Sequence, residues 1–311
     1  MLRAVALAES GRHTAHPNPL VGAVVVDAGG AVVGEGFHRA PGEGHAEALA
    51  LEMAGPRAKD GTLYVTLEPC NHHGRTPPCT DAVLASGVAR VVVALEDPDS
   101  RVRGVGLQRL RDAGLAVEVG VGREEATDQN RDYLHHRASG LPWVVLKWAA
   151  SVEGLQAAAD GTSQWITGDD ARADAHRLRA EADAVMVGSG TFLADQPALT
   201  CRLPGYDGPQ PLRVVMDRRH RVPGDKGWLV YDGSLKEALR DLGQRGVVRL
   251  LVEGGPTLGA ALSGEGLVDE YVSYVAPLAL AGAPTLSAGR RLRRRDIKEV
   301  GDDVRITWVA S

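Results

Sequence analysis

Short runs of apolar, β-branched residues alternate with segments of helical period along most of the chain. The runs at 21–26 and 31–36 predict a hairpin, because the residues between them are typical of a turn. Further strands are predicted at 62–67, 90–95 and 115–120, and helices at 2–9, 45–54, 79–86 and 106–113. Strands and helices in alternation predict an α/β fold, in which helices cover the faces of a sheet.

The chain is long enough for two domains. Its 311 residues are about twice the usual size of one domain. A polar stretch over 123–140 predicts a helix and a linker, so we expect a first domain over 1–140 and a second over 141–311. The second half is also α/β, with strands predicted at 143–149, 183–188, 212–217, 247–254 and 269–277 and helices at 169–182, 234–243 and 256–263.

Composition and charge argue against several classes of protein. Apolar residues make up 44% of the chain and charged residues 24%, which argues against a disordered, fibrous or membrane protein. The net charge of −5 provides no general attraction for nucleic acids or anionic membranes. The first sixteen residues lack the basic and apolar regions of a secretory signal, so we expect a cytoplasmic protein. We also expect a homo-oligomer that binds neither nucleic acid nor membrane.

Two local features have simple interpretations. The longest apolar runs are interrupted by Lys147 and Pro277 and are shorter than the ~20 residues of a membrane span. The arginine-rich run at 290–295 could bind phosphate or RNA. Because a short charge run is usually solvated, we predict a surface turn there.

Histidine, glutamate and cysteine residues are spaced in a way that indicates a zinc site. His45 and Glu47 open one predicted helix, Cys70 follows a predicted strand, and Cys79 opens another helix. One imidazole and two thiolates match the three protein ligands of a catalytic zinc site, whose fourth position holds water. Glu47 can then carry a proton from that water to a departing ammonia, as in zinc deaminases. We expect both cysteines at helix N-termini, where amide dipoles favour the thiolate.

Two alternatives stay open for these residues. They could lie apart, in the core or on the surface, without a shared metal. They could also form a closed structural zinc site, with His72 or His73 as the fourth ligand. A disulfide framework is not expected, since the chain has three cysteines and no export signal.

A glycine-rich turn in the second half indicates a dinucleotide site. No G-x-G-x-x-G sequence follows a first strand, so the usual dinucleotide fingerprint is absent. The sequence EGGPT at 253–257 instead stands between a predicted strand and a predicted helix. Glycines there let a pyrophosphate approach the backbone, and the helix N-terminus favours its charge. Such turns also occur without any ligand, so this signal is weak alone.

The stretches HPNPLVGAVVV, GHAEALAL and YVTLEPCNHHGRTPPCTDAV resemble the riboflavin-biosynthesis deaminases, the N-terminal half of the bifunctional RibD family. The resemblance implies a cytidine-deaminase-like, three-layer α/β/α domain. Its implied reaction is hydrolytic deamination of 2,5-diamino-6-ribosylamino-4(3H)-pyrimidinone 5′-phosphate. By position, Asn18 and His38 face the substrate. The insert between the cysteines offers Arg75 for the phosphate and His72 or His73 for polar contacts.

The stretches LKWAASVEG, SQWIT and VEGGPTLGAAL resemble the reductases of the same family, which have a dihydrofolate-reductase-like α/β fold. The two resemblances cover nearly the whole chain in the expected order. They imply that NADPH reduces 5-amino-6-(5-phosphoribosylamino)uracil to the ribitylamino product. NADPH contacts are implied for Ala149, Trp165, Thr191, Asp195, Arg218, Gly255, Pro256, Thr257, Leu258 and Gly259. Substrate contacts are implied for Ser163, Arg179, Leu199, Arg202 and Glu253.

The second half also departs from the family pattern. The usual Ser-x-Asp-Gly-Arg stretch is here SVEGL at 151–155, which keeps the acid as Glu153 but has Leu155 in place of the arginine. Arg218 and Arg219 replace a common Asp-Ser pair and can supply positive charge near the 2′-phosphate of NADPH. Cys201 lies between two implied substrate contacts, so it should line or border the reductase pocket. The alternative, a buried apolar cysteine without a role, stays open, because free cysteines are often buried and inert.

Two other functions are alternatives to a bifunctional enzyme that acts on small molecules. A deaminase of nucleic-acid bases would need a basic groove and aromatic platforms, whereas this chain is acidic and only 4% aromatic. A zinc-stabilised regulatory protein, whose reductase half is inactive because of Leu155, is the non-enzymatic alternative.

Overall fold

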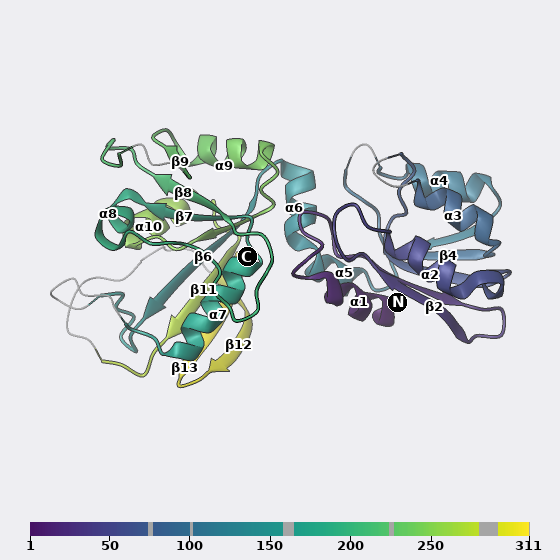
Figure 1. Cartoon of the computed structure of the whole chain (residues 1–311), viewed down its shortest axis with the longest axis horizontal. Helices are drawn as coiled ribbons and strands as arrows, with labels where there is room; N and C mark the ends of the chain where they lie inside the picture. Colours follow the sequence, from purple (N-terminus) through teal and green to yellow (C-terminus); the bar gives the residue numbers. More distant parts are fainter. Residues whose placement is uncertain (74–76, 100–101, 158–164, 224–226, 280–291, 311) are drawn as a thin grey trace. The chain divides into compact units, whose positions relative to one another are not determined.

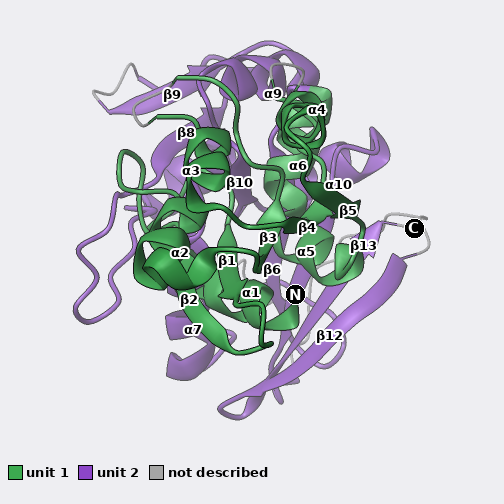
Figure 2. Ribbon diagram, turned by 90° about the vertical axis from the view of Figure 1, so that its right-hand side faces the viewer, with its two compact units in different colours: residues 1–139 green, residues 140–311 purple. Residues whose placement is uncertain are grey.

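The computed structural model describes residues 1–73, 77–99, 102–157, 165–223, 227–279 and 292–310. The chain divides into two compact units, Met1–Ser139 and Gly140–Ser311, coloured separately in Figure 2.

Unit 1 is built on a five-stranded sheet with the strand order β2-β1-β3-β4-β5 (Figure 1). Strand β1 is antiparallel to β2 and β3, whereas β3, β4 and β5 are parallel to one another. The carboxyl ends of β3 and β4 therefore lie at the same edge of the sheet. The strands are β1 Gly22–Val26, β2 Val32–Phe37, β3 Thr62–Leu67, β4 Arg90–Leu95 and β5 Ala116–Val119.

Helices cover both faces of this sheet. One core joins Val25, Leu63 and Val91 of the strands to apolar residues of α2, α3 and α4. The other face packs α1, α5 and α6 around Leu67 and Leu95. The predicted three-layer, cytidine-deaminase-like fold is confirmed. The helices are α1 Leu2–Ala8, α2 Ala46–Ala54, α3 Cys79–Ser86, α4 Val105–Asp112, α5 Arg123–Gln129 and α6 Arg131–Ser139, with 3₁₀ turns at Glu9–Gly11 and Gly55–Ala58.

Helix α2 lies unusually close to the sheet because β2 contains two glycines. A Cβ at Gly34 would be 2.0 Å from the carbonyl oxygen of Ala50, and one at Gly36 would be 2.5 Å from that of Ala46. Any larger residue would push α2 away from β2. These glycines therefore set the position of the helix that begins directly after His45.

The polar stretch before the boundary forms two helices rather than the predicted helix and linker. Asn130 separates α5 from α6, with φ −112° and ψ 21°. Its buried side chain accepts a hydrogen bond from the backbone N–H of Leu20 and donates one to the Leu20 carbonyl. The Asn130 amide thus pairs with a segment that is distant in the sequence. A separate helix, α6, begins directly after it.

Unit 2 contains an eight-stranded sheet with the order β12-β13-β11-β6-β10-β7-β8-β9. Six neighbouring strands, from β11 to β9, are parallel, and β13 and β12 add an antiparallel edge. The strands are β6 Trp143–Ala150, β7 Ala184–Gly188, β8 Leu212–Met216, β9 Trp228–Tyr231, β10 Arg249–Val252, β11 Glu270–Val275, β12 Leu292–Val300 and β13 Asp303–Ala310.

Helices lie on both faces of this sheet as well. Leu239 of α9 and Leu262 of α10 pack in one core, and Leu178 of α7 and Phe192 of α8 pack in the other. The predicted α/β class is confirmed for this unit. No sequence pattern predicted α8, β9, β12 and β13. The helices are α7 Asp169–Ala180, α8 Ser189–Asp195, α9 Leu235–Gln244 and α10 Pro256–Gly264.

The arginine-rich run does not form the predicted surface turn. Arg293, Arg294 and Arg295 belong to strand β12 and are exposed, so the predicted solvation is confirmed while the turn is wrong. Their strand pairs with β13, and charged side chains are common on edge strands because they discourage pairing with other molecules. Residues 290 and 291 lie outside the described residues.

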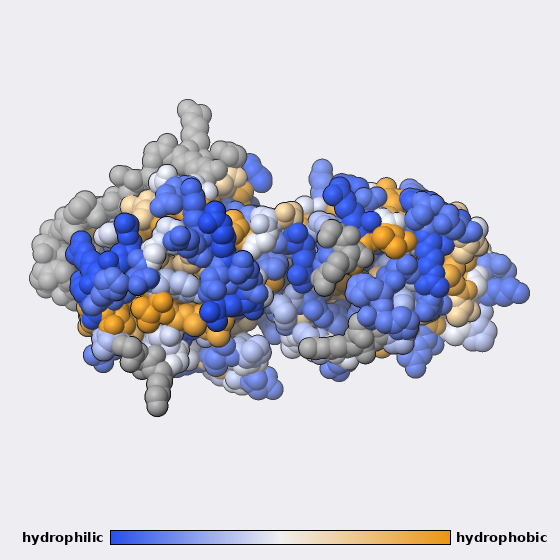
Figure 3. Space-filling model, turned by 90° about the horizontal axis from the view of Figure 1, so that it is seen from above, coloured by the Kyte–Doolittle hydropathy of each residue, from blue (hydrophilic) through white to orange (hydrophobic). Residues whose placement is uncertain are grey.

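Among the described helices, none is long and apolar enough to cross a membrane. On the face shown in Figure 3, hydrophilic residues predominate and hydrophobic ones lie in groups between them.

Candidate functional site

The three predicted metal ligands come together at the carboxyl end of β3. Cys70 lies in the loop after β3, Cys79 is the first residue of α3, and His45 precedes α2. The Nδ1 atom of His45 is 3.1 Å from Sγ of Cys79 and 3.6 Å from Sγ of Cys70. The possible ligand atoms all lie within 4.8 Å of one another.

These separations fit a tetrahedral zinc ion. Bonds of about 2.1 Å to nitrogen and 2.3 Å to sulfur place neighbouring ligand atoms roughly 3.6 Å apart. His72, proposed as a fourth ligand of a closed site, is exposed and does not belong to the cluster of three. Three protein ligands leave one position of the ion open, which is the arrangement of catalytic zinc sites.

The two thiols differ in their surroundings. Cys79 starts a helix as predicted, but the prediction for Cys70 is wrong, because this residue lies in a loop. Its sulfur instead accepts a hydrogen bond of 3.4 Å from the backbone N–H of Cys79, at the start of α3. Contacts from the Cys79 thiol and from His45 lower the pKa of Cys70. The start of α3 therefore stabilises the Cys70 sulfur, whereas the contact with Cys70 and burial raise the pKa of the Cys79 thiol, so the predicted thiolate-favouring effect is not seen at Cys79.

Glu47 lies in the same site and has the position of a proton carrier. It is in the first turn of α2, two residues after His45, and its side chain is buried. Burial raises the pKa of its carboxyl group, and the group contacts the Cys79 thiol. A carboxyl group that is not itself a ligand can receive and return a proton beside the metal.

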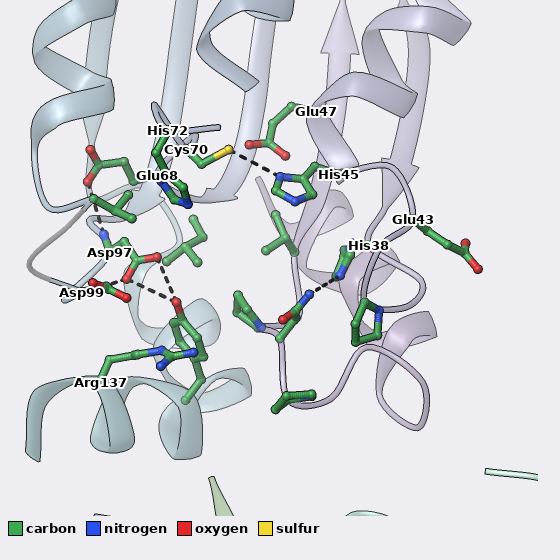
Figure 4. A pocket seen from close by; sticks show the side chains of 18 of the residues that line it. His38, Glu43, His45, Glu47, Glu68, Cys70, His72, Asp97, Asp99 and Arg137 are labelled. Carbon is green, nitrogen blue, oxygen red and sulfur yellow. Dashed lines mark hydrogen bonds between the residues drawn. The ribbon is translucent and has the colours of Figure 1, made fainter. Parts of the chain in front are cut away.

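A cavity of about 400 Å³ opens in front of these groups (Figure 4). Asn18 and His38, the predicted substrate contacts, both line it, and their side chains are joined by a hydrogen bond of 2.9 Å. Burial lowers the pKa of His38, which favours the neutral ring. His72 also lines the cavity, and Arg75 lies outside the described residues.

Polar contacts hold the loop that carries Cys70. The Glu68 carboxylate accepts hydrogen bonds from the backbone N–H groups of Asp97, Gly104, Gly106 and Leu107. They tie the end of β3 to the start of α4.

Arg109 connects the segments that follow the two cysteines. Its guanidinium donates to Oδ1 of Asn71 at 2.7 Å and to Oγ1 of Thr80 at 2.9 Å, and it pairs with Asp81 at 2.7 Å. Asn71 and Thr80 are the residues directly after Cys70 and Cys79. Arg109 therefore fixes the spacing of the two thiols from outside the metal site.

Sequence reasoning missed one wall of this cavity, formed by Asp97, Asp99, Tyr133 and Arg137. The Tyr133 hydroxyl donates to the Asp97 carboxylate at 3.1 Å. Asp97 follows β4, and ligands of parallel sheets bind at the carboxyl ends of strands, so this residue had a usable signal. Tyr133 and Arg137 had none, because α6 reaches the cavity only through the fold.

Unit 2 contains a second cavity, of about 510 Å³. It brings together eight residues that the sequence assigned to NADPH or substrate: Ala149, Trp165, Arg179, Thr191, Asp195, Leu199, Arg202 and Glu253. Lys147, Arg172 and His176 line it too and were not predicted. The guanidinium of Arg172 stacks over the Trp165 ring, 4.7 Å from its centre.

Glu253 is the buried ionic centre of this cavity. Its carboxylate accepts two hydrogen bonds from Arg179, at 2.5 and 2.9 Å, and lies 3.6 Å from Nζ of Lys147. Burial raises the pKa of Glu253, but Lys147 and Arg179 outweigh it and lower the pKa to about 2. Glu253 is therefore a carboxylate at any physiological pH.

The glycine-rich turn begins α10, with Gly255 as its N-cap, and lies beside the second cavity. A Cβ at Gly255 would be 3.8 Å from Oγ1 of Thr191, which lines the cavity. The residues from Gly255 to Gly259 are not themselves among the lining residues, and neither is Arg218, which is exposed after β8. Ser163 lies outside the described residues.

Two further expectations for unit 2 have different outcomes. Cys201 is buried and does not line the cavity, whereas Leu199 and Arg202 on either side of it do. In the SVEGL stretch, the Ser151 hydroxyl donates to Glu153 at 2.6 Å and accepts from the Leu155 N–H at 3.3 Å. Glu153 therefore closes a local turn.

Family models match both units of the chain. Residues 142–306 match the RibD C-terminal domain, and residues 1–95 match the cytidine and deoxycytidylate deaminase zinc-binding region. The chain belongs to the RibD family.

Other members of the RibD family are similar over nearly the full chain. The RibD protein of Escherichia coli K12 is 41% identical over 355 residues, covering 98% of this chain and 96% of that protein. The RibD structure from Acinetobacter baumannii, form 1, has a TM-score of 0.93 at 37% identity, covering 100% of this chain and 97% of the other. A deaminase/reductase structure from Thermotoga maritima has a TM-score of 0.87 at 31% identity, with the same coverage.

RibD membership defines the general function of the two units. The chain is a bifunctional deaminase and reductase of riboflavin biosynthesis, with a zinc-binding deaminase site. His45, Cys70 and Cys79 all fall within the part that matches the zinc-binding region. Unit 2, which matches the RibD C-terminal domain, is the reductase half of the chain.

Proposed function

We propose that unit 1 deaminates 2,5-diamino-6-ribosylamino-4(3H)-pyrimidinone 5′-phosphate and that unit 2 reduces the product with NADPH. The Thermotoga maritima relative is described as a diaminohydroxyphosphoribosylaminopyrimidine deaminase/5-amino-6-(5-phosphoribosylamino)uracil reductase. The observation that carries the proposal is the convergence of His45, Cys70 and Cys79 in a cavity with the buried Glu47.

Deamination replaces the amino group on a ring carbon by oxygen. His45, Cys70 and Cys79 would hold the zinc ion, which when bound would supply a water of lowered pKa. Glu47 would take a proton from that water as the new C–O bond forms, and it would return the proton to the nitrogen as the C–N bond breaks and ammonia leaves. Asn18 and His38 hold the pyrimidine ring, with Arg75 toward the phosphate.

Reduction converts the ribosyl group to a ribityl group. NADPH, when bound, would supply the hydride for C1 of the opened ribose and solvent would supply the proton, while the side chains of the cavity would orient the substrate and balance its charge. We assign Arg179, Leu199, Arg202, Glu253 and Ser163 to the substrate. We assign to NADPH the residues Ala149, Trp165, Thr191, Asp195, Arg218, Gly255, Pro256, Thr257, Leu258 and Gly259.

Preference for NADPH over NADH tests the assignment of Arg218. A guanidinium near the 2′-phosphate favours NADPH, so Arg218→Ala should reduce the preference by roughly 1–3 kcal/mol, the scale of a hydrogen bond to a charged group. The measurement is kcat/KM for both cofactors. Equal use of the two cofactors by the native enzyme contradicts the assignment.

The remaining assignments follow the same proposal. The catalytic domains are 1–140 and 141–311, and the enzyme is a cytoplasmic homo-oligomer whose partner is a phosphorylated pyrimidine. The count of subunits is measured by light scattering in solution.

One assay separates this proposal from a regulatory protein without activity. The purified chain is given the diaminopyrimidine phosphate with and without NADPH. We expect ammonia release in both cases and NADPH oxidation that follows ammonia release. Zinc binding without ammonia release would favour the regulatory alternative.

A further inference from the structure

We propose that Arg137 of α6 binds the phosphate group of the deaminase substrate, at the end of the cavity away from the zinc ligands. This inference rests on the proposed function of unit 1. It adds a specificity-determining residue that no sequence motif indicates.

The charges that line the cavity require a cation for such a substrate. Among the lining residues that the structure describes, Arg137 is the one lysine or arginine. On the described walls of the cavity a phosphate dianion would otherwise meet carboxylates, so Arg137 would act together with Arg75, which the proposed function assigns to the same phosphate. Arginine suits phosphate because it can donate two hydrogen bonds to it. The carboxylates on this lining are Glu43, Glu47, Glu68, Asp97 and Asp99.

Local contacts hold the Arg137 guanidinium while leaving it able to donate. It lies over the Tyr133 ring, 5.0 Å from the ring centre, which is a cation–π distance. Its Nε atom is buried and has no hydrogen-bond partner within the described part of the chain. Because buried donors are normally paired, this atom indicates a ligand.

Tyr133 and Asn130 give this wall a fixed position. Tyr133 donates to Asp97, and Asp97 also accepts from the Asp99 N–H at 2.9 Å. Asn130, buried between α5 and α6, ties the start of α6 to Leu20. The first turn of α6, which precedes Arg137, is thus tied to Leu20 through Asn130 and to Asp97 through Tyr133.

The separation of Arg137 from the metal site matches an elongated substrate. Figure 4 shows Arg137 on α6 well apart from His45, Glu47 and Cys70. With the reacting amino group at the zinc end, the ribose extends along the cavity and its 5′-phosphate points toward Arg137. The guanidinium then recognises the part of the substrate that takes no part in the reaction.

The test compares the phosphorylated substrate with its dephosphorylated counterpart. Arg137→Met keeps the length of the stem but removes the charge, so KM for the phosphorylated compound should rise roughly 10- to 100-fold, the effect of losing a charge-assisted hydrogen bond. The kcat should change little, and turnover of the dephosphorylated compound should not change. Arg137→Lys should restore part of the loss. Arg111→Met, on the exposed side of α4, is the matched control.

Zinc content and NADPH oxidation with deaminated substrate show whether each variant is folded. Arg137→Gln is a second variant without the charge, for use if Arg137→Met does not fold. An equal KM change for both compounds, or no change for either, overturns the inference while the native deaminase activity stands. If the native enzyme releases no ammonia from the phosphorylated compound, the proposed function itself fails.

Discussion

The deaminase and reductase cavities differ in the sign of the charges that line them. In the described part of unit 1, five carboxylates and one thiol line the cavity with a single arginine. Among the described lining residues of unit 2, Lys147, Arg172, Arg179 and Arg202 face two carboxylates, those of Asp195 and Glu253. The first cavity thus suits a bound cation, whereas the second carries its own cations for phosphorylated ligands.

The two cavities also differ in how their residues are held. His45 and Cys79 adjoin the first turns of helices, so short motifs position them. Lys147, Arg179 and Glu253 come from three distant elements and hold one another through ion pairs. A site built from local motifs tolerates change elsewhere, and a site built from mutual ion pairs depends on each partner.

Removal of zinc should separate the two activities most strongly. A chelator should abolish ammonia release, because the ligands would then have no ion to activate water. NADPH oxidation with deaminated substrate should continue, since unit 2 supplies its charges from side chains. Added zinc should restore ammonia release. Equal loss of both activities would break the comparison.

Glu47→Gln should lower the deaminase rate by roughly 10²- to 10⁴-fold, the size of a general acid–base contribution. Glutamine keeps the shape but carries no proton, so zinc content and reductase activity should stay the same. Glu52→Gln, exposed on the same helix, is the control. Near-native deamination by the Glu47 variant would refute the role of this residue.

Glu253→Gln should destabilise unit 2 by about 3 kcal/mol, because it leaves Lys147 and Arg179 without their carboxylate. Chemical denaturation followed by tryptophan fluorescence measures the free energy of unfolding, with the exposed Glu265→Gln as control.

The acid dependence of the Glu253 effect has a definite sign. The native pKa of about 2 lies below the ordinary value of 4.5, so the stabilisation is complete above pH 4.5 and is lost as the pH falls toward 2. The difference between native protein and variant should therefore shrink over that range. A difference that is constant down to pH 2 would contradict the ion pairs.

Arg109→Met should have the smallest effect, a loss of zinc affinity of about 10-fold. Residues behind the metal ligands typically contribute 10- to 100-fold, and this side chain is 40% exposed, which favours the low end. Competition with a chromogenic chelator measures the affinity, and Arg111→Met controls for the loss of charge. An unchanged affinity would show that the cysteine spacing does not need Arg109.

Sequence patterns predicted the central strands and the helices beside them well, and they predicted the edge strands of the sheets poorly. Strands β3 and β4 and helix α3 begin and end where their apolar period predicted. Strand β12 was missed because its residues 293–299 are exposed and, apart from Ile297, charged, so no apolar alternation marks it. Helix α6 lies where the polar stretch predicts a linker. Asn130 breaks the helical stretch through a hydrogen bond to Leu20, a residue far away in the sequence, so no local pattern indicates the second helix.

The sequence by itself determined the metal ligands, the proton carrier and the order of the two units, because each depends on residue types at short spacing next to strand ends and helix starts. Only the tertiary structure decided that Cys70 shares the helix start of Cys79, that Glu253 is paired with Lys147 and Arg179, and that α6 brings Tyr133 and Arg137 to the deaminase cavity. These contacts join residues far apart in the chain. They depend on how helices and strands pack, which no local pattern of residues encodes.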